Sequence, residues 1–109
     1  MIYILTNKPS EKQLNEMLEV FSTFIKLAVD IERGILAGGG SQHADCEYLL
    51  LEEGSLQENI WGADWIPSRH ELTFEALINI RPQLNNMSMD IQDEGIKEKI
   101  QEIVFRIFG

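Results

Sequence analysis

The sequence predicts an α+β domain: an antiparallel meander sheet of four to five strands, packed on one face by two amphipathic helices. Two observations lead to this prediction. Stretches with alternating apolar and polar residues, typical of half-buried strands, fill the middle of the chain. Stretches with helical spacing of apolar residues lie near its two ends. With 109 residues, the chain is expected to form one domain over residues 1–109, with a single core.

The first elements expected are a short strand and a helix. The strand is IYIL, residues 2–5, and the sequence NKPS ends it. Ser10 is a suitable N-cap, and Gln13 three residues later completes a capping box. Leu14, Met17, Leu18 and Phe21 then follow at helical spacing. We therefore expect a helix from Glu11 to about Ser22.

Two strands are expected next. FIKLAVDIE, residues 24–32, alternates between apolar and polar positions. Arg33 and Gly34 indicate a turn, and ILAG, residues 35–38, is a further short strand. The glycines Gly38 to Gly40 match no phosphate-binding pattern, which favours a tight turn over a phosphate cradle.

The segment HADCEYLLLEEG, residues 43–54, fits two structures. As a strand, it points Ala44, Cys46, Tyr48 and Leu50 toward the core. As a helix, it has a suitable composition, a cap at Ser41 and a closing glycine at Gly54. We favour the strand and leave the helix open. In the strand, Cys46 is a small core residue and not a nucleophile.

The last third of the chain contains two further strands and a helix. The strands are NIWGADWI, residues 59–66, and ELTFEALINI, residues 71–80. The loop RPQLNNMS, residues 81–88, follows. Arg81 and the asparagines Asn79, Asn85 and Asn86 either order this loop or bind a carboxylate or phosphate through Arg81. Asp93 then caps a final helix with a clear apolar stripe.

Charge and cysteine content exclude several classes of function. Nine Lys and Arg against eighteen Asp and Glu residues give a net charge of −9. Such a surface repels phosphate backbones, so nucleic-acid binding is not expected. A lone cysteine fits a reducing compartment, and the chain has no basic leader and no apolar run of membrane length. We expect a cytoplasmic protein without a membrane partner.

The second face of the predicted sheet is unusually rich in carboxylates. Like charges on neighbouring strands repel each other, so a cation or a partner should compensate them. The residues expected on this face are Asp30, Glu32, His43, Asp45, Glu47, Glu75, Asn79 and Arg81, together with Asp64 if the tryptophan face of its strand points inward.

One interpretation of this face is a divalent metal site. Its ligands would be His43, Asp45 and Glu47, joined by Asp30 and Glu32 from a neighbouring strand. One imidazole with several carboxylates suits Mn, Fe, Mg or catalytic Zn. The alternatives are a solvated acidic face with a hydrogen-bonded histidine, and metal-free acid–base use of His43.

Two functions follow from these interpretations. The first is a non-enzymatic module of unknown function that binds a protein partner or forms a homodimer through its open sheet face. The second is a hydrolase or lyase in which His43 is a ligand or general base. In that enzyme, Asp45 and Glu47 are ligands and Arg81 holds an anion.

Four runs of sequence carry a family resemblance. They are VDIERGILAGGG, HADCE, EEGSLQENIWGADW and LINIRP. With them the chain resembles a family of small, uncharacterised bacterial proteins, from about Ile2 to the last helix. The resemblance implies a stand-alone cytoplasmic protein of one domain, and it brings no activity, substrate or cofactor.

Overall fold

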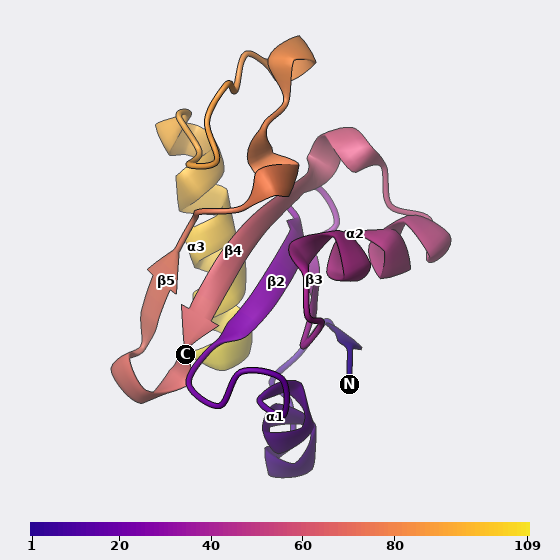
Figure 1. Ribbon diagram of the computed structural model, residues 1–109, viewed down its shortest axis with the longest axis vertical. Helices are drawn as coiled ribbons and strands as arrows, with labels where there is room; N and C mark the ends of the chain where they lie inside the picture. Colours follow the sequence, from indigo (N-terminus) through magenta and orange to yellow (C-terminus); the bar gives the residue numbers. More distant parts are fainter.

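The computed structural model describes residues 1–109 and confirms the α+β class. One antiparallel sheet of five strands forms its centre, in the order β1-β3-β2-β4-β5 (Figure 1). The strands are β1 (Tyr3–Leu5), β2 (Ile25–Asp30), β3 (Ile35–Gly38), β4 (Ile60–Ile66) and β5 (Glu71–Thr73). The helices are α1 (Glu11–Met17), α2 (His43–Glu52) and α3 (Glu94–Phe108). The strand order differs from the predicted meander because β3 lies between β1 and β2.

The helices from the two ends of the chain share one core, as predicted. In α1 the capping box forms: the Ser10 hydroxyl accepts from the Gln13 N–H at 3.1 Å, and the Gln13 side chain accepts from the Ser10 N–H at 3.0 Å. The carboxylate of Asp93 caps α3 by accepting from two backbone N–H groups. The apolar sides of both helices pack with one face of the sheet. The buried residues of this core include Met17, Leu27, Val29, Trp61, Trp65, Ile100 and Val104.

The favoured strand over residues 43–53 is wrong, because residues 43–52 form α2. This helix packs on the opposite face of the sheet from α3 (Figure 1), through a second core that includes Ala28, Ala37, Cys46 and Leu50. The sheet-facing side of α2 carries polar His43 and Glu47 beside apolar residues, so its apolar stripe is interrupted. The sheet face that we expected to be open is therefore largely covered.

The strand expected over residues 71–80 ends early, at Thr73. The chain then leaves β4 and forms a 3₁₀ turn at Leu77–Asn79. Gly62 of β4 permits this path, because a Cβ at that position would lie 2.5 Å from the Cβ of Ala76. Further 3₁₀ turns occur at Gln57–Asn59, Pro67–Arg69 and Pro82–Leu84.

The glycine run ends β3 and turns the chain into α2. Gly39 has a φ of +106°, and a Cβ there would lie 2.2 Å from the carbonyl oxygen of Met1. The predicted tight turn is confirmed, and close contact with the N-terminal residue requires a glycine there. None of the helices combines the length and apolar character that a membrane crossing requires.

Candidate functional site

The structure separates the predicted site residues into two polar pairs and three isolated carboxylates. His43 pairs with Asp64, and Glu47 pairs with Arg81. Asp30 is fully buried at the end of β2, where one carboxylate oxygen accepts from the N–H groups of Glu32 and Arg33. Asp30 therefore shapes the turn between β2 and β3.

The carboxylates of the predicted metal site do not converge. Asp45 is exposed and accepts a hydrogen bond from Ser41, while Glu32 is exposed in the turn after β2. No group of three or more His, Cys, Asp and Glu side chains lies close enough together to hold a metal ion. The five proposed ligands thus do not form one site in this fold.

Glu47 and Arg81 form a buried ion pair between α2 and the segment that follows β5. Arg81 Nη2 donates to Glu47 Oε2 at 2.7 Å, and Nη1 donates to the Gln57 carbonyl at 2.6 Å. The guanidinium carbon also lies 5.7 Å from the centre of the Trp61 ring. Arg81 is therefore paired inside the protein, and Glu47 takes the place of the anion that it was expected to hold.

Burial influences both partners of this pair. Desolvation raises the pKa of the Glu47 carboxyl, although the nearby Arg81 charge opposes this. Desolvation also lowers the pKa of Arg81, against the effect of Glu47. Truncating one member of such a pair leaves the other charge buried without its partner.

His43 and Asp64 form the second pair. His43 is the first residue of α2, and Asp64 lies on β4 and faces the same side of the sheet as α2. The distance from His43 Nε2 to Asp64 Oδ1 is 2.7 Å. A carboxylate accepts from an N–H, so the hydrogen bond places the imidazole proton on Nε2. Nδ1 makes no hydrogen bond within the protein.

A groove of about 760 Å³ opens beside this pair. His43 and Ala44 of α2 form one wall, and Leu77 and Ile78 form another. Its lining combines apolar side chains with polar and charged ones, and its volume lies within the range of about 300–1,000 Å³ that is typical of small-molecule sites. The groove is therefore the best candidate site in the molecule. The residues that line it are Lys26, Ser41, Gln42, His43, Ala44, Asp64, Thr73, Glu75, Ala76, Leu77, Ile78 and Met89.

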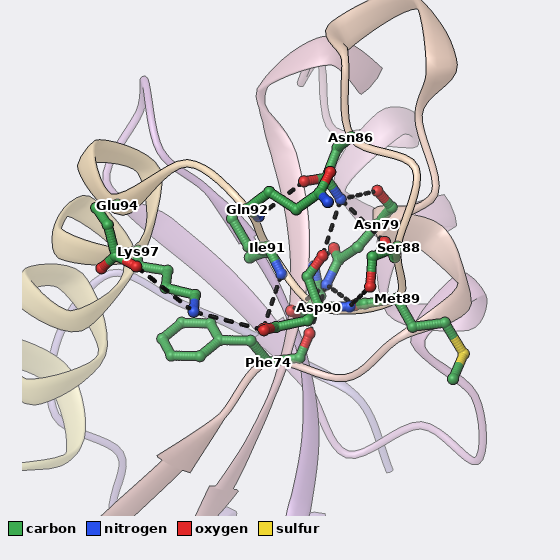
Figure 2. Close-up of polar contacts among 11 residues, drawn as sticks. Phe74, Asn79, Asn86, Ser88, Met89, Asp90, Ile91, Gln92, Glu94 and Lys97 are labelled. Atoms are coloured by element: carbon green, nitrogen blue, oxygen red, sulfur yellow. Dashed lines mark hydrogen bonds and ion pairs between the residues drawn. The ribbon is translucent and has the colours of Figure 1, made fainter.

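Two buried asparagines hold together the segment from Phe74 to Gln92, which includes the groove wall of Leu77 and Ile78 (Figure 2). The side chain of Asn79 accepts from the Gly62 N–H at 2.7 Å and donates to the carbonyls of Gly62, Phe74 and Met89. Asn86 donates to three further carbonyls and accepts from the Gln92 N–H. The interpretation that asparagines order this loop is confirmed for these two residues.

Cys46 takes no part in the groove. It is fully buried against the sheet, and burial raises the pKa of its thiol to about 11. A thiol with this pKa is almost entirely protonated near neutral pH and is a poor nucleophile. The prediction that Cys46 is a core residue is confirmed.

The chain was also compared with known proteins. A family model described as "Protein of unknown function (DUF5674)" matches residues 3–107. The chain belongs to this family. No curated protein and no solved structure is significantly similar to it. The resemblance to an uncharacterised family is thus confirmed, and the function of this DUF5674 domain has to be argued from its own geometry.

Sequence reasoning selected His43 and Asp64 for the polar face but did not pair them. Lys26, which lines the groove, was not selected at all. Lys26 lies directly opposite Asp64 in the register of β2 and β4. Only the strand pairing reveals this proximity, because the two residues are far apart in the sequence.

Proposed function

We propose that the groove binds a small ligand and that His43, oriented by Asp64, accepts a proton from it. The observation that supports this is the 2.7 Å hydrogen bond between the two side chains at the wall of the groove. The carboxylate fixes the orientation and tautomer of the imidazole, as in catalytic dyads of hydrolases. The free Nδ1 is then the basic atom.

The proposal keeps one part of the enzyme hypothesis and leaves out the rest. His43 retains the role of general base, and Asp64 takes the role of positioning residue. Asp45, Glu47 and Arg81 are not needed, and neither is a metal ion. A positioned base contributes roughly 10²–10⁴-fold to a rate, which suits hydrolase or lyase chemistry with one critical proton transfer.

Imidazole NMR tests the proposal because the protein contains only two histidines. His70 is the internal control: it is exposed and packs on the edge of Trp65, away from the residues of the groove. We expect the Nε2–H tautomer for His43, and a shift to Nδ1–H in Asp64→Asn, whose amide can donate to Nε2. An Nδ1–H tautomer in the wild type would contradict the proposal.

A fragment screen followed by hydrogen exchange tests the chemistry. We expect members of a diverse fragment collection to shift the His43 signals and leave those of His70 unchanged. For a bound compound with an acidic C–H, exchange of that proton in D₂O should be slower by roughly 100-fold in His43→Gln. The proposal fails if no fragment shifts His43, or if exchange is equally fast in the variant.

Self-association, partner binding and a cytoplasmic location stay predictions. The first reason for expecting a homodimer was an open sheet face, and α2 covers that face. A lone, buried thiol still fits a reducing compartment. Sedimentation velocity at increasing concentrations is the direct test of self-association, and a constant monomer mass would contradict the homodimer.

A further inference from the structure

The floor of the groove is a row of three side chains across neighbouring strands. Lys26 of β2 lies opposite Asp64 of β4, and Asp64 lies opposite Thr73 of β5. Neighbouring strands are about 4.8 Å apart, so the side chains of a lysine, an aspartate and a threonine start from adjacent points of one sheet face. All three residues line the groove.

The charged side chains of the groove, two in this row and one beside it, are not paired with each other in ion pairs. Lys26 makes no ion pair, and its ammonium lies 5.0 Å from the centre of the Phe21 ring. Asp64 uses Oδ1 for His43, and Oδ2 has no hydrogen-bond partner in the protein. Glu75, exposed in the same groove, also has no ion-pair partner. One positive and two negative groups are thus available to a ligand.

An apolar surface stands next to these charges. The side chain of Leu77 is the most exposed large apolar side chain in the protein, at 73%. Ile78 and Met89 continue the same wall of the groove. Removing such an apolar surface from water is favourable. An apolar group of the ligand would therefore bind here.

We propose that the ligand is an α-amino acid with an apolar side chain. Its carboxylate binds Lys26, its ammonium binds Asp64 Oδ2 or Glu75, and its side chain packs on Leu77. A phosphate or other multiply charged anion fits less well, because it would meet both carboxylates. A neutral hydrocarbon would leave Lys26 and Glu75 without partners. The inference rests on the proposed function, since it concerns the same groove.

Calorimetry with leucine and its derivatives tests the ligand class. Leucinamide lacks the carboxylate, N-acetylleucine lacks the ammonium, and glycine lacks the side chain. Each derivative should bind at least about tenfold more weakly than leucine, because a charge-assisted hydrogen bond or an apolar contact is lost. Tighter binding of the dipeptide leucylleucine would overturn the choice of a free amino acid.

Two variants assign the contacts to residues. Lys26→Gln should bind leucine and leucinamide equally, and Glu75→Gln should bind leucine and N-acetylleucine with a smaller difference than the wild type. The matched controls are Lys99→Gln and Glu98→Gln, both exposed on α3, which should keep the wild-type preferences. Unchanged preferences in both groove variants would overturn the proposal.

The outcomes for the two proposals are distinguishable. If leucine does not bind, but another compound shifts the His43 signals and its C–H exchange is slower in His43→Gln, the amino-acid inference fails and the proton-transfer proposal stands. If no compound shifts His43, both proposals fail. If leucine binds and shifts His70 but not His43, it occupies another site, and the amino-acid inference fails.

Discussion

Replacing Glu47 with leucine should destabilise the protein severely. The substitution leaves the Arg81 guanidinium buried, with only the Gln57 carbonyl and the Trp61 ring as partners. Breaking a buried pair in this way costs about 3–5 kcal/mol. A domain of this size has a total stability of about 5–15 kcal/mol, so the loss is a large fraction of it. The melting temperature should fall by at least about 10 °C.

The double variant Glu47→Leu with Arg81→Met separates the lost pair from general damage to the core. Both charges are then absent, and the partners lost are the uncharged groups of Gln57. We expect the double variant to regain at least about 2 kcal/mol relative to Glu47→Leu alone. The control is Glu53→Leu, which breaks the half-exposed pair of Arg33 and Glu53 and should cost less than about 1 kcal/mol.

Urea denaturation followed by tryptophan fluorescence measures these free energies, since Trp61 and Trp65 are both in the core. The prediction is refuted if the losses of unfolding free energy in Glu47→Leu and in Arg81→Met, measured separately, add up to the loss in the double variant. It is also refuted if Glu47→Leu costs no more than Glu53→Leu. Either result would mean that the buried charges do not depend on each other.

The same pair gives a pH dependence with a definite sign. Burial raises the pKa of Glu47 above its ordinary value of 4.5, so the folded state holds this proton more tightly than the unfolded state. Its contribution to stability is present below pH 4.5 and is lost as the pH rises through the raised value. The free energy of unfolding of the wild type minus that of Glu47→Gln should therefore decrease as the pH rises. An increase would show that attraction to Arg81 outweighs burial.

Three further predictions concern the core and its turns. Iodoacetamide should modify Cys46 only as fast as the folded protein opens, because the thiol is buried and has a pKa of about 11. Rapid modification of the folded protein would contradict this. Gly39→Ala should destabilise the protein more than Gly54→Ala in thermal melts: both have positive φ, but only Gly39 lacks space for a Cβ. Gly54→Ala should cost only the backbone strain, about 1–2 kcal/mol. Asn79→Ala leaves the N–H and carbonyl of buried Gly62 unpaired and should cost at least about 2 kcal/mol in urea denaturation, against almost none for exposed Gln83→Ala.

Local patterns predicted those elements whose signal lies within a few residues. The capping box at Ser10 and Gln13 and the cap at Asp93 correctly located the starts of α1 and α3. Alternation along β2 and β4 correctly assigned the inward-facing residues, including both tryptophans. These signals are local because a cap or a strand face is defined by neighbouring residues.

Elements that depend on distant partners were not predictable in the same way. The polar residues on the buried side of α2 find their partners, Asp64 and Arg81, far along the chain, so the helix lacks a clean apolar stripe. The strand after Glu71 ends early because the side chain of Asn79 bonds to Gly62 where a strand would pair. The groove itself exists only once β2, β4 and β5 are in register.

The side-chain amide of Asn79 also prevents the sheet from pairing with a strand of another molecule. It occupies both hydrogen-bonding groups of Gly62 at a point where β5 no longer covers β4. The strands at the two edges, β1 and β5, are only three residues long, and exposed Glu71 places a charge on β5. A strand from another molecule therefore finds few free backbone groups to pair with, because the edge strands are short and charged and Asn79 occupies the uncovered part of β4. The bonds that shape the groove thus also help to keep this sheet from joining with others into aggregates.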